Sequence, residues 1–147
     1  MPISPANIPI PTMTNNKRFL DTSGLFSLLD ASEVRHEKAA DSFRAAIGLV
    51  TTNYVLAEFI PLSTSRGFGR SESLSFLNDL VRLPRLELVW VDEPLHTAAM
   101  ELLESRLDKS YSLCDAVSFV VMRERSISEA LTTDRHFEQE GFVRLLR

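Results

Sequence analysis

From Lys17 onward, short apolar runs alternate with longer stretches in which apolar residues recur every three or four positions. The short runs predict β-strands at 17–21, 48–52, 86–91, 130–133 and 142–146. The periodic stretches predict helices at 36–47, 53–65, 71–81, 94–107 and 112–124. Short strands that alternate with helices need crossover connections, which favour a mostly parallel sheet with helices on both faces. The pattern therefore predicts an α/β fold in three layers, α/β/α, around a central five-stranded sheet.

The first 16 residues lack this pattern. They carry several prolines among small polar residues and show no apolar period. Such a composition cannot bury enough apolar surface to offset the entropy that ordering costs. We therefore expect residues 1–16 to form a disordered tail and residues 17–147 to form one domain, which is long enough to bury a proper core.

Composition narrows the class of protein. Hydrophobic residues make up 44% and charged residues 24% of the chain, as in ordinary soluble domains. The longest apolar stretch, at 113–122, is about half a membrane span and contains an acid. Because no basic segment followed by an apolar core opens the chain, we expect a cytoplasmic protein without membrane contact. The single Cys114 excludes an internal disulfide framework and a cysteine-based zinc site.

The overall charge is acidic, with a net value of −4 and a pI near 5.4. This net negative charge argues against a protein that binds nucleic acid mainly through its overall electrostatic attraction, because such domains are basic. It does not exclude a nuclease. A bound divalent cation reverses the local charge, and a few arginines can hold phosphates nearby.

Two acidic residues, Asp21 and Asp134, directly follow predicted strands. If the sheet is parallel, both lie at its carboxyl edge, where open α/β sheets bind ligands. The simpler interpretation is that each caps the helix that starts there, as Asp92 also could. Capping and catalysis are compatible, because both occur at the ends of strands.

Two further acids, Glu58 and Asp115, interrupt apolar stretches of predicted helices. Glu58 could belong to a narrow polar stripe that reaches solvent, and Asp115 could complement a helix dipole in the first turn. Ser112 and Ser118 share the helix face of Asp115. A polar strip on an otherwise apolar helix suggests a functional site.

Bringing these four carboxylates together requires positive charge. Two unit charges about 4 Å apart repel by roughly 4 kcal/mol at an effective dielectric constant of 20. Hard oxygen ligands favour Mg²⁺ or Mn²⁺ over zinc. Such an ion can activate water and stabilise charge on a phosphodiester. The acids therefore predict a metal-dependent hydrolase.

Other reactive residues have simpler explanations. A nucleophilic Cys114, with His36, His96 or His136 as its base, is disfavoured because a cysteine inside an apolar helix is usually inert packing. His136 adjoins Asp134 and either touches substrate or lies on the surface of a short helix.

The segment from Arg66 to Arg70 combines two cations with Phe68 on a glycine-containing loop. It would suit RNA, with arginine on phosphate and phenylalanine against a base, and it would equally suit an ordinary connection between helices. Neither of its glycines belongs to a phosphate-cradling motif.

Four segments carry a resemblance to a known family, and each contains one of the acids. They are residues 19–25, 51–58, 111–119 and 130–137. Their order and spacing resemble those of the PIN-domain ribonucleases, especially the toxin subunits of bacterial VapC-type toxin–antitoxin pairs. The resemblance covers residues 17–147, and although each motif is weak by itself, four in this order are fairly specific.

The resemblance implies a parallel sheet with its first and fourth strands at the centre. It implies that Asp21 and Asp115 bind the catalytic metal, Mg²⁺ or Mn²⁺, and that Glu58 and Asp134 complete the catalytic set. The family commonly has small polar residues that support these acids, and this chain places three there: Asn53, Ser112 and Thr133. The candidate RNA contacts are Arg66, Arg70 and Arg135.

The leading hypothesis is a metal-dependent endoribonuclease that acts as the toxin of a type II toxin–antitoxin system. The resemblance further implies an RNA substrate, a homodimer and a cognate antitoxin that blocks the site. The main alternative is a non-catalytic module of the same fold that binds RNA or protein. A phosphoacceptor receiver or an aspartyl-phosphate phosphatase fits less well, because no lysine follows Lys109 and Ser23 stands where a phosphatase has its second Asp.

Overall fold

The computed structural model describes residues 16–147. The predicted tail lies outside the described residues except for Asn16, whose carbonyl oxygen accepts the backbone N–H groups of Ile47 and Gly48.

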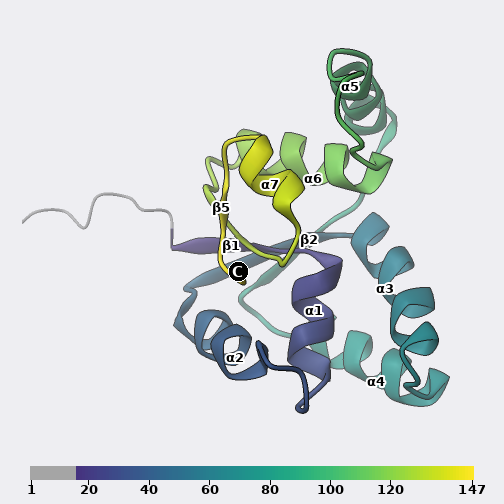
Figure 1. Cartoon of the computed structure of the whole chain (residues 1–147), viewed down its shortest axis with the longest axis vertical. Coiled ribbons are helices and arrows are strands. Elements are labelled where there is room, and N and C mark those ends of the chain that lie inside the picture. The colour runs from purple at the N-terminus through teal and green to yellow at the C-terminus, as the bar shows by residue number, and fades with distance from the viewer. Residues whose placement is uncertain (1–15) are drawn as a thin grey trace, which may run out of the picture.

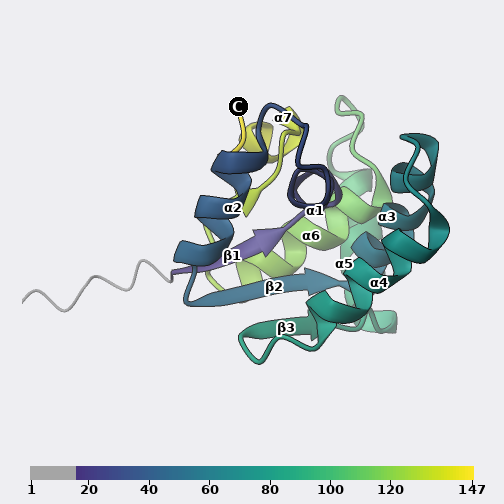
Figure 2. The same cartoon turned by 90° about the horizontal axis from the view of Figure 1, so that it is seen from below.

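A five-stranded sheet forms the centre of the molecule, in the order β3-β2-β1-β4-β5, and every neighbouring pair is parallel. The strands are β1 (Lys17–Leu20), β2 (Gly48–Thr52), β3 (Leu86–Val89), β4 (Glu129–Leu131) and β5 (Val143–Arg144). Figure 2 shows the arrows of β1, β2 and β3 pointing the same way. The first strand is central and the fourth lies beside it, which confirms the predicted fold class.

Seven helices connect these strands in the described part of the chain: α1 (Thr22–Leu29), α2 (His36–Ala45), α3 (Asn53–Ser65), α4 (Arg70–Val81), α5 (Glu93–Glu104), α6 (Leu113–Glu124) and α7 (Arg135–Gln139). In Figure 1, α1, α2 and α4 lie on one side of the sheet and α5, α6 and α7 on the other. The predicted helices are all present. The largest boundary difference is in α5, which ends at Glu104 because Ser105 and Arg106 turn back onto its last carbonyl groups.

The central strands are apolar because both of their faces are covered by helices. Phe19, Leu20, Val50 and Leu131 are almost completely buried. Helix α6 supplies much of the remaining core from 116 to 122, and its apolar residues leave little room for an unpaired charge. The acid at the start of that helix therefore needs polar partners.

Helix α1 approaches β4 very closely at Gly24. A Cβ atom on this residue would lie 1.9 Å from the carbonyl oxygen of Leu131. That oxygen also accepts the backbone N–H of Asp21 at 3.2 Å. The absence of a side chain at Gly24 therefore lets the start of α1 sit against the end of β4.

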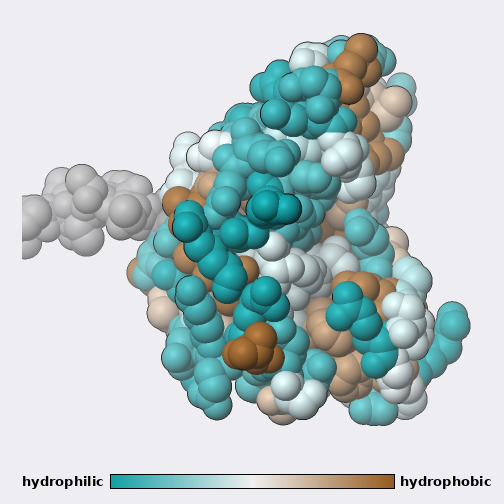
Figure 3. Space-filling model, viewed as in Figure 1, coloured by the Kyte–Doolittle hydropathy of each residue, from teal (hydrophilic) through white to brown (hydrophobic). Residues whose placement is uncertain are grey.

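The molecular surface is predominantly hydrophilic on the face shown in Figure 3, with scattered hydrophobic patches. No helix within residues 16–147 is long and apolar enough to cross a membrane.

Candidate active site

Asp21 lies at the end of β1 and is 6% exposed. Its Oδ2 atom accepts hydrogen bonds from the hydroxyl groups of Thr132, at 2.7 Å, and Ser23, at 3.3 Å. The residue occupies the N-cap position of α1, but its side chain makes no capping hydrogen bond. Capping therefore does not explain the buried carboxylate, although the position was predicted correctly.

Asp115 occupies the first turn of α6 and is also buried. It forms a capping box with Ser112, in which the Ser112 N–H donates to Asp115 Oδ2 and the Asp115 N–H donates to Ser112 Oγ, both at 3.0 Å. The same Oδ2 atom lies 2.9 Å from Nδ1 of His136. The first-turn interpretation is confirmed, and the carboxylate has a second partner in α7.

Asp134 caps α7, since its Oδ1 atom accepts the backbone N–H of His136 at 2.9 Å. Its Oδ2 atom lies 3.4 Å from the ring Nδ1 of the same histidine. Asp115, Asp134 and His136 each offer one ligand atom, and these atoms lie within 4.8 Å of one another. The cap prediction is confirmed, and the cap residue joins a group that could hold a metal ion.

The negative charges in this region act on Asp21. Burial, which is the largest cause, and the charges of Asp115 and Asp134 together raise the pKa of the Asp21 carboxyl from 3.8 to about 7, against the opposing hydrogen bond from Thr132. Carboxylates from β1, α6 and the end of β4 are therefore close enough to disfavour one another's ionisation. Oxygen donors with excess negative charge are the set that a hard divalent cation prefers.

Glu58 projects from α3 and is exposed, which agrees with a polar stripe that reaches solvent. Its carboxylate nevertheless lies near Cys114. Burial raises the pKa of the Cys114 thiol, and interactions with Glu58, Asp21 and Asp115 raise it further. The cysteine therefore stays protonated at neutral pH, which makes it a poor nucleophile.

The three predicted supporting residues have different places. Ser112 forms the capping box with Asp115. The N–H of Thr133 donates to Ser23 Oγ at 3.0 Å, and Asn53 Oδ1 accepts the N–H of Val91 at 2.8 Å. Asn53 thus joins the start of α3 to the segment after β3 rather than holding an acid.

Sequence reasoning missed Thr132 as a partner of Asp21. The strand register accounts for this contact: Leu20 pairs with Leu131, so Asp21 and Thr132, which come next in the chain, are neighbours. His136 was expected on the surface or at the substrate, and it is half-buried between two acids. Its position two residues after an N-cap places its ring beside the cap carboxylate.

The candidate RNA contacts Arg66, Arg70 and Arg135 are all exposed. Arg66 lies over the ring of Phe26, with its guanidinium carbon 5.1 Å from the ring centroid.

Comparison with known proteins identifies the family. The model of the PIN domain matches residues 18–142. The chain belongs to the PIN-domain family. It is 34% identical over 126 residues to the 23S rRNA-specific endonuclease VapC20 of Mycobacterium tuberculosis, from strain CDC 1551 / Oshkosh and from strain H37Rv, an alignment that covers 85% of this chain and 95% of the relative.

The fold comparison agrees. The crystal structure of Mycobacterium tuberculosis VapC20, described as a toxin that cleaves the sarcin-ricin loop, matches with a TM-score of 0.76 and 29% sequence identity. The match covers 85% of this chain and 95% of that one. The prediction of a VapC-type PIN endoribonuclease is thereby confirmed. Such nucleases typically use a metal, and this chain has an acidic cluster suited to one.

Proposed function

We propose that this PIN-domain protein is a toxin that uses Mg²⁺ or Mn²⁺ to hydrolyse phosphodiester bonds of ribosomal RNA. The observation that carries the proposal is the convergence of Asp21, Asp115 and Asp134: ligand atoms of Asp115 and Asp134 lie within 4.8 Å of each other, and the hydroxyl of Thr132 hydrogen-bonds both Asp21 and the backbone of Asp134. Bringing three carboxylates from separate elements together does not stabilise the fold by itself, because each negative charge raises the pKa of the others. A divalent cation compensates for that repulsion.

The proposed role of each acid follows from its burial. Asp21 and Asp115, both buried, would hold the cation, while Asp134 and the exposed Glu58 would complete the catalytic set at its rim. Thr132 and Ser23 fix the orientation of the Asp21 carboxylate. His136 does the same for Asp115, so that the carboxylates do not need to reorganise during the reaction.

The reaction follows from these roles. A divalent cation, when bound, lowers the pKa of a water molecule and supplies positive charge to the phosphodiester under attack. Glu58 and Asp134 are the more exposed carboxylates, and in this proposal they would accept a proton from the attacking water. The buried pair cannot take that role while it holds the cation.

Ribosomal RNA as the substrate class is supported by the relatives that this chain covers at 95% of their length. The exposed arginines at 66, 70 and 135 provide positive charge for an RNA backbone on an otherwise acidic protein.

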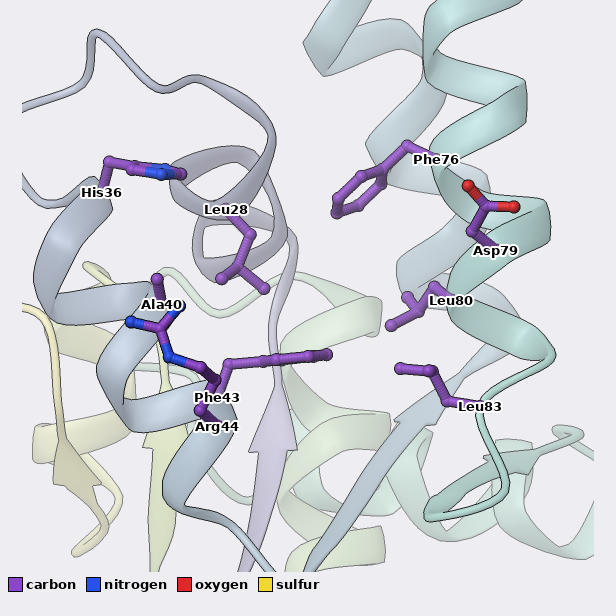
Figure 4. Close-up of a pocket in the computed structure, with 9 residues that line it drawn as sticks. All are labelled: Leu28, His36, Ala40, Phe43, Arg44, Phe76, Asp79, Leu80 and Leu83. Atoms are coloured by element: carbon purple, nitrogen blue, oxygen red, sulfur yellow. The ribbon is translucent and has the colours of Figure 1, made fainter.

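We also propose a cognate antitoxin as a partner. An apolar groove of about 420 Å³ lies between α1, α2 and α4. Figure 4 shows Leu28 and Phe43 on one side of it, facing Phe76, Leu80 and Leu83 on the other. An amphipathic segment of a partner protein would bury its apolar side in such a groove.

A homodimer is the second proposed assembly. Leu74 and Val81 of α4 are 41% and 39% exposed, and they offer apolar surface that a second copy would cover. Sedimentation of the purified protein tests this proposal, and a single species at the mass of one chain would contradict it.

The nuclease assignment is tested by cleavage of a 23S rRNA fragment that carries the sarcin-ricin loop, with Mg²⁺ or Mn²⁺. We expect cleavage to stop in EDTA and to fall at least about 100-fold in Asp21→Asn, because loss of a metal ligand removes stabilisation of transition-state charge. The matched control is Asp92→Asn, since Asp92 caps α5 through the N–H of Leu95. Undiminished cleavage by Asp21→Asn would overturn the assignment, and RNA binding without cleavage would support a non-catalytic module.

A further inference from the structure

A small recess lies beside the acidic cluster. Its volume is about 140 Å³, and its wall includes Ser23, Thr133, Arg35 and Arg66. Ser23 is also a direct neighbour of Asp21, with its Oγ atom 3.3 Å from Asp21 Oδ2. The recess and the proposed metal site therefore share one wall. Its volume is well below the roughly 300 Å³ of a typical small-molecule pocket, so it would take one chemical group of a longer ligand.

Arg66 supplies an uncompensated positive charge to this recess. Its guanidinium lies against the ring of Phe26, and no acidic side chain among residues 16–147 forms an ion pair with it. Stacking on an aromatic face leaves the N–H groups at the guanidinium edge available as donors. Phe26 is itself buried and packs edge-on against Phe68 at 5.7 Å, so the platform under Arg66 is fixed.

Arg35 supplies a second cation that is held in position. Its Nη1 atom donates to Glu33 Oε1 at 3.0 Å, and its backbone N–H donates to Glu33 Oε2 at 2.8 Å. The Arg35 side chain is 38% exposed. Glu33 balances one of the two guanidinium charges, which leaves the recess with one net positive charge next to a cluster of carboxylates.

This charge arrangement has a clear use for a polyanion. A net charge of −4 and at least three clustered acids repel RNA from the place where it must be cut. A fixed cation in a recess whose wall includes Ser23, a neighbour of Asp21, would hold the RNA backbone against that repulsion. Phosphate oxygens match the planar donor edge of a guanidinium, which can bind two of them through parallel hydrogen bonds.

We propose that Arg35 and Arg66 form a subsite, walled by Ser23 and Thr133, that binds an RNA phosphate adjacent to the one that is cleaved. The subsite rests on the proposed endoribonuclease function. It defines the direction in which the RNA strand leaves the acidic cluster, past α1 toward the loop after α3. Because it contacts the backbone, it contributes to affinity for every sequence equally.

Binding measured without cleavage tests the subsite. The probe is a fluorescein-labelled RNA stem-loop with the sarcin-ricin sequence, whose anisotropy is followed in EDTA across salt concentrations. We expect Arg66→Gln to weaken binding about five- to tenfold at low salt, and the slope of log K against log salt to become shallower by about 0.7. Arg66→Lys is expected to keep the slope of the unmodified protein, because the charge remains. A stem-loop of scrambled sequence should lose affinity by the same factor.

The matched control is Arg82→Gln, an exposed arginine at the end of α4 that lies outside the recess. Arg35→Gln should weaken binding as Arg66→Gln does, but it also removes the side-chain partner of Glu33. If Arg35→Gln does not fold, the result for the exposed Arg66 decides the test. Equal affinities and slopes for Arg66→Gln and Arg82→Gln would overturn the subsite, as would an unmodified protein that binds no RNA. Cleavage with Mg²⁺ or Mn²⁺ is scored separately, so a protein that binds through the recess but does not cleave would refute only the proposed function.

Discussion

Thr132 donates a 2.7 Å hydrogen bond to Oδ2 of Asp21, from the end of β4 to the end of β1. The two residues are 111 positions apart in the chain and become neighbours through the pairing of Leu20 with Leu131. The same hydroxyl oxygen accepts the backbone N–H of Asp134 at 3.0 Å. One threonine therefore connects two of the clustered acids and sets their separation.

Replacing Thr132 with valine keeps the shape of the side chain and removes the hydroxyl. The Asp134 N–H loses its acceptor and Asp21 loses a donor, so we expect the free energy of unfolding to fall by about 1–3 kcal/mol. Cleavage should also slow, because Asp21 is less firmly oriented. Urea denaturation and kcat/KM measure the two effects. Thr97→Val is the control, since Thr97 is an exposed residue of α5 away from the acids, and equal behaviour of the two variants would contradict the prediction.

Asp21 makes the metal-free protein sensitive to pH. Its folded-state pKa of about 7 lies above the ordinary value of 3.8, so the folded protein binds a proton that the unfolded chain has released. The contribution of Asp21 to the free energy of unfolding is therefore fully present below about pH 4 and is lost as the pH rises through 7. The difference between the two pKa values corresponds to roughly 4 kcal/mol.

Asp21→Asn removes this titration. We expect the variant to be more stable than the unmodified protein at pH 8 in EDTA, and the gap to close toward pH 4. Chemical denaturation at several pH values measures it, and Asp41→Asn, which changes a surface acid paired with Arg44, should show no such trend. Mg²⁺ should raise the melting temperature of the unmodified protein and not that of Asp21→Asn. A less stable Asn variant at pH 8 would contradict a raised pKa at Asp21.

Glu140 anchors the C-terminal part of the fold. Its buried carboxylate accepts hydrogen bonds from Arg106, at 2.8 Å, and from Arg123, at 2.5 Å. Burial by itself would raise the pKa of Glu140, but the hydrogen bonds and charges of these arginines outweigh it and lower the pKa. The stabilisation is therefore present above the ordinary pKa of glutamate and is lost as the pH falls through the lowered value.

Glu140→Gln should lower the free energy of unfolding at pH 7 by about 1–3 kcal/mol, since both arginines lose a charged partner while staying partly exposed to solvent. Thermal denaturation measures the effect, and the exposed Glu104→Gln provides the reference. The loss should shrink in acid, where the native carboxylate is itself protonated. A loss of stability that stayed constant into strong acid would rule out the ion pairs as its cause.

Gly24→Ala should be strongly destabilising. The new Cβ atom would meet the backbone oxygen of Leu131 at 1.9 Å, which cannot move without breaking the end of β4. We expect a loss of at least about 3 kcal/mol, at the upper end of overpacking effects. Gly48→Ala is the matched control, because its Cβ atom would meet only the flexible Lys17 side chain, at 2.9 Å. Similar melting temperatures for both variants would mean that α1 can shift away from β4.

Much of the fold was predictable because periodicity reports burial. The runs at 17–21 and 48–52 are apolar since helices cover both faces of these strands, and the structure places β1 and β2 there. The predicted strand at 142–146 shortened to Val143–Arg144, because pairing depends on the length of its short neighbour β4, which the local sequence does not report.

The site was predictable only in part. Asp21 and Asp134 could be singled out as candidates because strand ends are visible in the hydrophobic pattern, and Asp115 because a carboxylate is conspicuous in an apolar helix. Thr132 was missed because it looks like any polar residue after a strand. Asn53 was expected beside the acids, and it binds the N–H of Val91, since side-chain direction at a helix start depends on which strand lies alongside.

By itself the sequence determined the elements, the parallel sheet and the four acids, because periodicity and residue type are local properties. Only the tertiary structure decided which oxygen meets which hydroxyl, that His136 lies between Asp115 and Asp134, and that Arg35 and Arg66 line one recess. These contacts depend on strand register and on the close approach of α1 to β4, and both are fixed by packing between residues far apart in the chain.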